Sequence, residues 1–511
     1  MNSVTGKFLT FIAALCMAGP AIAQLDDESR VAEIYAHRCK GCHGAEGDGL
    51  GPAAERLNPP PRDFTLGMYK FKSSGFEEFL PNDDDLLRMI RDGMAGTAMP
   101  GWGDILSNQE MADLVVYIKT LAGYAADEKP GQQVDYGTEI VSSAESVRIG
   151  KELFLDRDRC SECHGKAGKG DAIKSLKDDN GERTWPRNLT KPWTFRASND
   201  RRDIYSRIST GIPGTQMPSF SDPASDKVLS VDERWHVANY VSSLAKTEKI
   251  VRPENTVVKA AQLAGDLPDT ADDPAWQQAE PSTFFLVPQI LAEERLFRPS
   301  NDTISVSALY NEKNIAFLLE WDDRTMSIAG DETAEKIADG QVFEDSVAIQ
   351  LPLEIPQGME KPYFGMGDPT HLVNIWQWKS GTIDKPENVS LINARGIDDI
   401  ERQDAAAAGI RASGIYLDGS WRVVISRGLV TSRPEQDIQF AEGQFIPLAL
   451  AAWDGSNGES GSRHTMTSWY WLLLKPPAGP RPVVFAFVVI ALIFGGELAW
   501  ARSASRAREE Q

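Results

Sequence analysis

The 511-residue chain is poor in cysteine and histidine, with five and six residues, and it has no excess of positive charge. Its 53 lysines and arginines are outnumbered by 74 aspartates and glutamates, which gives a net charge of −21 and argues against a nucleic-acid partner. No phosphate-binding loop or nucleophile–base constellation is present, so we do not expect a complete enzyme. The length indicates several domains rather than one.

Long apolar runs are confined to the two ends of the chain. The first follows Lys7, continues to Ala18 and precedes an Ala21-Ile22-Ala23 cleavage site, as in a secretory signal peptide. We therefore expect residues 1–23 to be removed and the mature chain to lie in the periplasm. Cys16 would be lost with this segment, so the mature chain would have four cysteines and no disulfide.

The second apolar run, from Val483 to Trp500, is interrupted only by Glu497. Eighteen residues at ~1.5 Å per residue span about 27 Å, close to the hydrocarbon thickness of a bilayer. A buried core helix is the alternative. Because arginines follow in residues 502–511, we expect a transmembrane anchor at 482–501 and a cytoplasmic tail after it. The rest of the protein would then lie on the periplasmic side of the bacterial inner membrane.

The four remaining cysteines form two C-x-x-C-H motifs, Cys39–His43 and Cys160–His164. This spacing lets two thiols add to the vinyl groups of one haem while the adjacent histidine reaches the iron. A zinc site is the alternative, but it would need further ligands, and only His37 is near the first motif. The sequence therefore predicts two covalent haem c groups, bound through Cys39, Cys42, Cys160 and Cys163.

The two motifs belong to a tandem repeat of roughly 120 residues. Each motif follows a helical segment and precedes a Pro-Arg pair, a Met-Pro pair and an amphipathic helix. The repeats, predicted as domains 24–125 and 138–248, resemble class I cytochrome c domains. The resemblance implies that His43 and His164 are proximal iron ligands and that Met99 and Met217 are distal ones.

A haem with histidine on one side and methionine on the other is six-coordinate, which suits electron transfer. The alternative is a di-haem cytochrome c peroxidase, which needs one haem that can open a coordination position. Each repeat has its own Met-Pro pair, which argues against this alternative. Met89 and Met94 lie near the first pair but outside the repeated Gly-x-x-Met-Pro setting.

From about residue 257 the apolar residues recur at every second position, as in strands. Strands are predicted at residues 304–310, 315–321, 346–351, 372–378, 421–426, 445–453 and 469–474, with a hairpin turn at Asp418-Gly419. A β-sandwich at residues 255–477 fits this pattern best. The predicted fold class is therefore two all-α cytochrome c domains, an all-β sandwich and one C-terminal transmembrane helix.

The β-domain is similar to the haem-binding γ subunits of the ethylbenzene dehydrogenase family of molybdenum enzymes. The resemblance implies one non-covalent haem b with methionine and lysine as axial ligands. The methionine position matches Met366, and His464 stands at the lysine position, so the predicted pair is Met366 and His464. Met466 and His371 are competing ligands nearby. The similar segments are residues 348–352, 365–369, 373–379, 452–455 and 468–470.

This resemblance implies a membrane-anchored multihaem subunit that exchanges electrons with the molybdenum and iron–sulfur subunits of an oxidoreductase. The partner enzyme would be a nitrate reductase, a nitrite oxidoreductase or a dehydrogenase. The c-type haems would connect it to a soluble cytochrome or a membrane oxidase or reductase. The alternative is a free-standing cytochrome c carrier whose β-domain is a ligand-binding module without haem.

Overall fold

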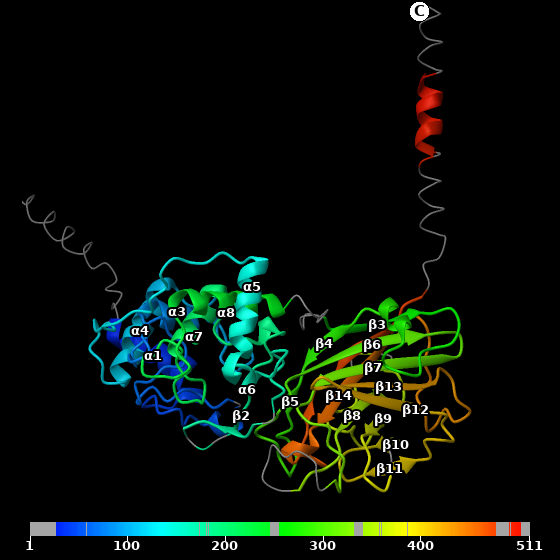
Figure 1. Cartoon of the computed structure of the whole chain (residues 1–511). Helices are drawn as coiled ribbons and strands as arrows, with labels where there is room; N and C mark the ends of the chain where they lie inside the picture. Colours follow the sequence, from blue (N-terminus) through cyan, green and yellow to red (C-terminus); the bar gives the residue numbers. More distant parts are fainter. Residues whose placement is uncertain are drawn as a thin grey trace, which may run out of the picture. The chain divides into compact units, whose positions relative to one another are not determined.

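The computed structural model describes residues 27–57, 59–172, 174–179, 181, 183–245, 255–331, 341–356, 358, 360–385, 387–476, 490 and 492–501. The predicted signal peptide at residues 1–23 lies outside these ranges. The chain divides into two units (Figure 1), which we name the helical unit and the sheet unit. The helical unit comprises Met1–Leu153, Asp178–Gly181 and Thr194–Ser242, and the sheet unit comprises Phe154–Lys177, Glu182–Trp193 and Ser243–Gln511.

The helical unit contains the first repeat and most helices of the second. In the first repeat, α1, α3 and α4 bury one face each around Tyr35, Ile90 and Leu114. Helix α4 begins at a capping box in which Ser107 and Glu110 satisfy each other's backbone N–H groups. The helices that lie wholly or largely in this unit are α1 (Asp27–Arg38), α2 (Lys40–His43), α3 (Asp83–Asp92), α4 (Asn108–Leu121), α5 (Ala144–Leu155), α7 (Arg201–Thr210) and α8 (Val231–Leu244).

The second repeat builds its core on the same plan. The ring of Trp235 in α8 stacks on that of Tyr205 in α7 at 4.4 Å, and both side chains are fully buried. Helix α5 approaches α8 so closely at Gly150 that an added Cβ would lie 2.0 Å from the carbonyl oxygen of His236. The helices predicted before each haem motif are therefore present and pack on the closing helices.

The residues that connect the repeats contact both of them. Val134 donates its N–H to the Ser73 carbonyl at 3.0 Å in the first repeat. In the second repeat, the Tyr205 hydroxyl donates to the Asp135 carbonyl at 2.6 Å. The residues just before the second repeat are therefore fixed by hydrogen bonds.

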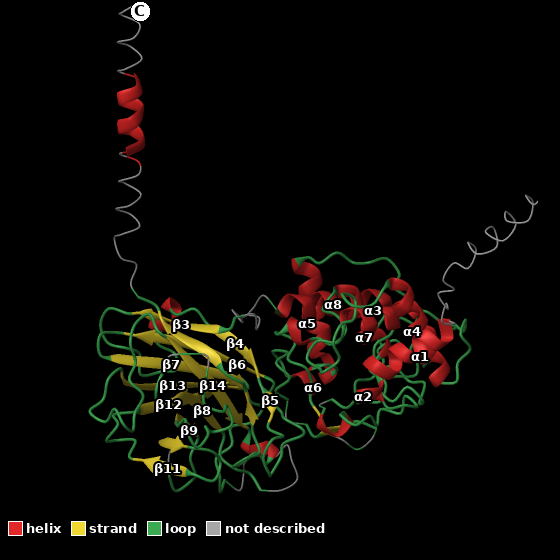
Figure 2. Cartoon of the chain, turned by 180° about the vertical axis from the view of Figure 1, so that it is seen from behind, coloured by secondary structure: helices red, strands yellow, loops and turns green. Residues whose placement is uncertain are grey.

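The sheet unit contains the predicted β-sandwich (Figure 2). The hydrogen-bonded order is β11-β10-β9-β8-β14-β16-β3-β6-β7-β13-β12, antiparallel except where β3 pairs with β16 and β6. One apolar core contains residues of both halves of this order, including Phe317 of β7 and Trp376 of β9. The strands are β3 (Val257–Gln262), β4 (Ser282–Phe285), β5 (Val287–Pro288), β6 (Thr303–Tyr310), β7 (Asn314–Asp322), β8 (Ser346–Pro352), β9 (Val373–Lys379), β10 (Asn388–Ala394), β11 (Ile400–Gln403), β12 (Arg411–Leu417), β13 (Ser420–Gly428), β14 (Phe445–Trp453), β15 (Thr465–Met466) and β16 (Tyr470–Leu474).

The segment with the second C-x-x-C-H motif also belongs to the sheet unit. It contains α6 (Ser161–His164) and a two-stranded sheet of β1 (Leu176–Lys177) and β2 (Arg183–Thr184). This division differs from the predicted domains, which placed residues 138–248 together. Several side chains connect this segment to the sandwich, and they are described with the site below.

The predicted transmembrane helix at residues 482–501 is wrong. No helix in the described ranges is long and apolar enough to cross a bilayer. At this end of the chain, residues 490 and 492–501 are helical. The prediction counted the whole apolar run as one helix. Residues 477–489, 491 and 502–511 lie outside the described residues.

Candidate haem sites

The first C-x-x-C-H motif forms a single helical turn. Cys39 caps α2, and its carbonyl accepts the N–H groups of Cys42 at 3.1 Å and His43 at 2.9 Å. Residues three and four positions apart share one face of such a turn, so both thiols and the imidazole face the same side. Both cysteines are half-buried and form no disulfide. This arrangement fits two thioether bonds and one iron ligand to a single haem.

The His43 ring is held by its other nitrogen. Its Nδ1 lies 3.0 Å from the Arg62 carbonyl oxygen, and its ring stacks on Phe64 at 4.5 Å. A carbonyl only accepts, so Nδ1 carries the proton and Nε2 keeps its lone pair for iron. Burial lowers the pKa of His43, which keeps the ring neutral.

The second motif repeats this geometry in the sheet unit. The Cys160 carbonyl accepts the N–H groups of Cys163 at 3.2 Å and His164 at 2.9 Å. The Nδ1 atom of His164 donates to the Arg187 carbonyl at 3.1 Å, and burial lowers the pKa of this histidine as well. The two carbonyls belong to the repeated Pro-Arg pairs, to which the sequence assigned no role.

Several buried donors have no hydrogen-bond partner among the described residues. They include the Tyr69 hydroxyl in the helical unit and the Trp193 indole N–H in the sheet unit. The Tyr69 ring lies 6.3 Å from Phe64, which stacks on His43. Buried donors normally have a partner, and the carboxylates of a bound haem are suitable acceptors. The surroundings of both motifs therefore fit the cofactor that the motifs predict.

The two predicted distal methionines occupy matching loops of the helical unit. In the first loop, Met94 donates its N–H to the Met99 carbonyl at 3.1 Å, and in the second, Ile212 does so to Met217 at 3.1 Å. A threonine hydroxyl accepts the N–H of each methionine, Thr97 at 3.1 Å and Thr215 at 3.2 Å. Both methionines are half-buried. Met217 lies in the helical unit and His164 in the sheet unit, and each is described within its own unit.

The predicted haem b ligands lie around one face of the sandwich. The face has an apolar floor of small and branched side chains, which are Ala348, Val373, Ile375, Ile392 and Ala394. Met366, Trp453 and Trp469 pack against this floor. His464 lies with its ring 4.6 Å from the Trp453 ring. An apolar floor that contacts a thioether and lies near an imidazole suits the binding of a porphyrin.

The backbone of Met366 is constrained. Its φ of 71° lies in the left-handed region, which a residue with a long side chain adopts only where the surroundings impose it. The Met366 carbonyl accepts the Gly396 N–H at 2.8 Å, and Gly367 donates to the Tyr363 carbonyl at 2.8 Å. These bonds hold the turn that directs the Met366 side chain onto the floor.

His464 is held just before β15, where its carbonyl accepts the Gln289 N–H at 2.9 Å. Burial lowers the pKa of His464 to about 4, so its ring is neutral at pH 7. The competing histidine, His371, is half-exposed and bonds through Nδ1 to Asp368 at 3.0 Å. Met466 is buried and pairs with Ala451, which packs against the floor.

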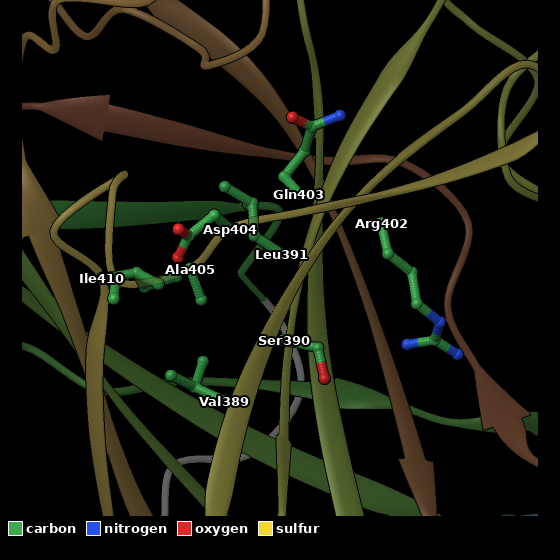
Figure 3. Close-up of a pocket in the computed structure, with 9 residues that line it drawn as sticks. Val389, Ser390, Leu391, Arg402, Gln403, Asp404, Ala405 and Ile410 are labelled. Atoms are coloured by element: carbon green, nitrogen blue, oxygen red, sulfur yellow. The ribbon is translucent and has the colours of Figure 1, made fainter.

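A separate hollow of about 520 Å³ lies along β10 and β11 (Figure 3). Its lining includes Leu391, Arg402 and Ile410 and contains no cysteine, histidine or methionine. It is therefore distinct from the predicted haem sites.

Comparison with known proteins assigns both parts of the chain. A cytochrome c family model matches residues 29–122 and 147–245, and an ethylbenzene dehydrogenase family model matches residues 273–396. With the paired C-x-x-C-H turns, these matches define an electron-transfer haem protein rather than a catalytic subunit. Both repeats are thus similar to the cytochrome c family, and part of the sandwich is similar to the ethylbenzene dehydrogenase family. The predicted resemblance is confirmed.

Two relatives have names that specify a role. A protein of Haloferax mediterranei, named as a respiratory nitrate reductase heme subunit, is 28% identical over 249 residues, or 48% of this chain and 83% of its own. The gamma subunit of chlorate reductase from Ideonella dechloratans is 28% identical over 158 residues, or 30% of this chain and 57% of its own.

Solved structures also resemble parts of the chain. A Kuenenia stuttgartiensis reducing HAO-like protein complex has 35% identity and a TM-score of 0.38 over 42% of this chain and 94% of the matched chain. A carbohydrate-binding module of family 9 from Caldicellulosiruptor kristjanssonii has 11% identity and a TM-score of 0.26, over 44% of this chain and 96% of its own. Likenesses at these scores carry no inference about ligands.

Proposed function

We propose that this chain is a periplasmic multihaem subunit that relays electrons between a molybdenum oxidoreductase and the respiratory chain. It would bind two covalent haem c groups and one haem b. The observation that carries the proposal is the presence, in one chain, of two matched C-x-x-C-H turns and an apolar floor flanked by Met366 and His464. The names of the nitrate reductase and chlorate reductase relatives support the type of partner.

The residues at each site have one task, which is to hold the iron in a fixed coordination state. Haem supplies the reversible one-electron chemistry when it is bound. At the first site, His43 presents Nε2 because the Arg62 carbonyl holds its Nδ1–H, and Met99 would provide the sixth ligand. With both positions filled by side chains, no position is left for a substrate, which suits a relay.

The chain's two kinds of site would serve the two ends of the relay. We infer that the haem b site in the sandwich exchanges electrons with an iron–sulfur subunit of the enzyme, which would be a nitrate reductase, a nitrite oxidoreductase or a dehydrogenase. The c-type sites would exchange electrons with a soluble cytochrome or a membrane oxidase or reductase. The acidic character of the chain suits partners with basic docking patches.

Haem analysis with ligand variants tests the cofactor assignment. We expect pyridine haemochrome spectra of the purified protein to give two haem c and one extractable haem b per chain. Met366→Ala and His464→Ala should each lower the haem b content, because each removes an axial ligand, and leave the haem c content unchanged. The matched variants Met466→Leu and His371→Ala should retain haem b. Full haem b in His464→Ala, with loss in Met466→Leu, would reassign the ligand.

Purification under native conditions tests the partner. Affinity capture of the chain from its own cells should recover molybdenum and iron–sulfur clusters in fixed proportion to haem. Reduction of the haem b band by the substrate of the captured enzyme would then give the direction of electron flow. Recovery of the fully haem-loaded chain without molybdenum, at every salt concentration tested, would instead identify a free-standing carrier.

A further inference from the structure

Three buried carboxylates meet where β7 ends, β8 begins and β14 ends. Asp323 follows β7, Asp345 precedes β8, and Asp454 follows β14. One oxygen of each lies within 4.8 Å of the others, and the three residues are 1%, 0% and 2% exposed. Acidic residues are rarely buried together without a compensating partner, because each charge loses its hydration.

Two of the carboxylates, those of Asp345 and Asp454, accept hydrogen bonds on both oxygens. Asp345 accepts N–H groups on both oxygens, from Gly455 at 2.8 Å on Oδ1 and from Ser327 at 2.6 Å on Oδ2. Trp421 adds its indole N–H to Oδ2 at 2.9 Å. Asp454 accepts hydroxyl and amide donors on both oxygens as well. Hydrogen bonds of this kind favour the charged carboxylate.

The third carboxylate has an unpartnered oxygen. Asp323 accepts the Thr325 N–H on Oδ1 at 3.2 Å, but its Oδ2 is buried without a hydrogen-bond partner. In the described part of the chain, no lysine, arginine or histidine nitrogen lies within 4.0 Å of Asp323, Asp345 or Asp454. Arg324 is adjacent in sequence, but its guanidinium donates to the backbone carbonyls of Gly170, Ser300 and Pro186.

We propose that Asp323, Asp345 and Asp454 bind one Ca²⁺ ion. All three ligands are hard oxygen donors, which Ca²⁺ prefers over transition metals. Two oxygens on opposite sides of one Ca²⁺ ion lie up to about 5 Å apart, which the observed spacing satisfies. The ion would give the orphaned Asp323 oxygen a partner and neutralise negative charge that the single Arg324 guanidinium offsets only in part.

The electrostatic surroundings of the cluster favour a bound positive charge, either a cation or a proton. Burial and the neighbouring carboxylates raise the pKa of Asp323 and Asp345 well above the ordinary value. Glu459, whose Oε2 accepts the Asp454 N–H at 3.1 Å, has its pKa raised to about 8 by burial and by Asp454. A divalent cation among these groups would restore the charged forms.

The ion would connect β7 to β8 and β14, which pair with each other and are separated from β7 in the sheet order. It would join the ends of β7, β8 and β14, and it would fix the residue that precedes Arg324. Arg324 donates hydrogen bonds to carbonyls of the segment with the second C-x-x-C-H motif. The ion would therefore also stabilise the attachment of that segment to the sandwich.

Metal analysis of the full-length, haem-loaded protein tests this site. After equilibration with Ca²⁺ and removal of free ion, we expect about one Ca²⁺ per chain above the Asp323→Asn variant, which should bind none at this site. Asp269→Asn, at a carboxylate that is 68% exposed, is the matched control and should bind as the wild type does. Ca²⁺ should raise the melting temperature of the wild type, and a chelator should lower it. Amide exchange at Ser327 and Gly455 should accelerate in the chelator.

A proton shared within the cluster is the competing state, and it predicts a different pattern. The wild type would then bind no Ca²⁺ at saturating concentration, and Asp323→Asn, which resembles a protonated aspartate, would be as stable as the wild type. That pattern would overturn the proposal, and so would a larger melting-temperature increase with Mg²⁺ than with Ca²⁺. If Asp323→Asn does not fold, the calcium content and chelator response of the wild type decide.

Discussion

At the scale of single residues, each c-type site depends on a backbone atom as much as on its histidine. The carbonyls of Arg62 and Arg187 fix the Nδ1 proton of His43 and His164. They reach the histidines because a glycine allows the chain to approach. An added Cβ at Gly49 would lie 2.9 Å from the Pro61 carbonyl oxygen, and one at Gly170 would lie 2.6 Å from that of Pro186.

We therefore predict that Gly49→Ala weakens the first haem site. At φ +75°, the new Cβ would push the Pro61–Arg62 backbone away from His43. Calorimetry should show a loss of unfolding free energy of about 2–3 kcal/mol, and the reduction potential of one haem c should change. Gly123→Ala is the matched control, because Gly123 has φ +79° and open space around its Cβ position. It should cost about 1 kcal/mol and leave the potentials unchanged; equal effects of both variants would contradict the prediction.

Some residues of these sites could be predicted from the sequence and others could not. The cysteine and histidine positions follow from covalent spacing, which is local. The roles of the Arg62 and Arg187 carbonyls could not be predicted in this way, because a residue of any type can provide a backbone carbonyl. The repeated Pro-Arg pair was nevertheless a usable signal. The carboxylates Asp323, Asp345 and Asp454 are distant in sequence and resemble ordinary turn residues until the strands bring them together.

At the scale of secondary-structure elements, the main feature is the attachment of the second haem-motif segment to the end of β7. Lys191 donates to Asp322 at 2.8 Å and to the Thr303 hydroxyl at 3.0 Å. The Asn188 amide donates to the same Asp322 oxygen at 2.9 Å. Burial alone would raise the pKa of Asp322, but the Lys191 ammonium lowers it below the ordinary value.

We predict that Lys191→Met detaches this segment and costs about 2 kcal/mol of unfolding free energy at pH 7. Because the folded-state pKa of Asp322 is lowered, its stabilising contribution is present above the unfolded pKa of ~4 and is lost as the pH falls through the folded pKa. The difference between wild type and variant should therefore shrink below about pH 4. Urea unfolding across this range measures it. An unchanged difference in acid would show that the lost stability is not electrostatic.

The elements were predicted where their apolar pattern was strong. The seven predicted strands correspond to β6, β7, β8, β9, β13, β14 and β16, and the Asp418-Gly419 turn joins β12 to β13. Among the strands that were missed, β11 is largely exposed and polar, and β12 is only partly buried. The transmembrane helix was wrong because hydropathy alone does not determine the length of a helix.

At the scale of the whole molecule, the grouping of residues 154–177 with the sandwich means that sequence repeats and structural units do not coincide. We predict that a fragment of residues 255–476 melts at a lower temperature than one of residues 138–476. The shorter fragment lacks Lys191 and Arg187, which pair with Asp322 and Asp302. Lys191→Met in the longer fragment should reduce the difference. Equal melting temperatures would show that the attachment adds no stability.

The attachment at Lys191 also bears on the history of the duplication. Counted from the Pro-Arg pair, the first copy has Asp63 and Leu66 where the second has Asn188 and Lys191. An aspartate at 188 would repel Asp322, and a leucine at 191 would leave that carboxylate without its cation. Leu66 itself is 60% exposed. Two substitutions thus distinguish a copy that can bind Asp322 of the sandwich from one that cannot. The repeats are alike around their haem motifs, but they are no longer interchangeable within the chain.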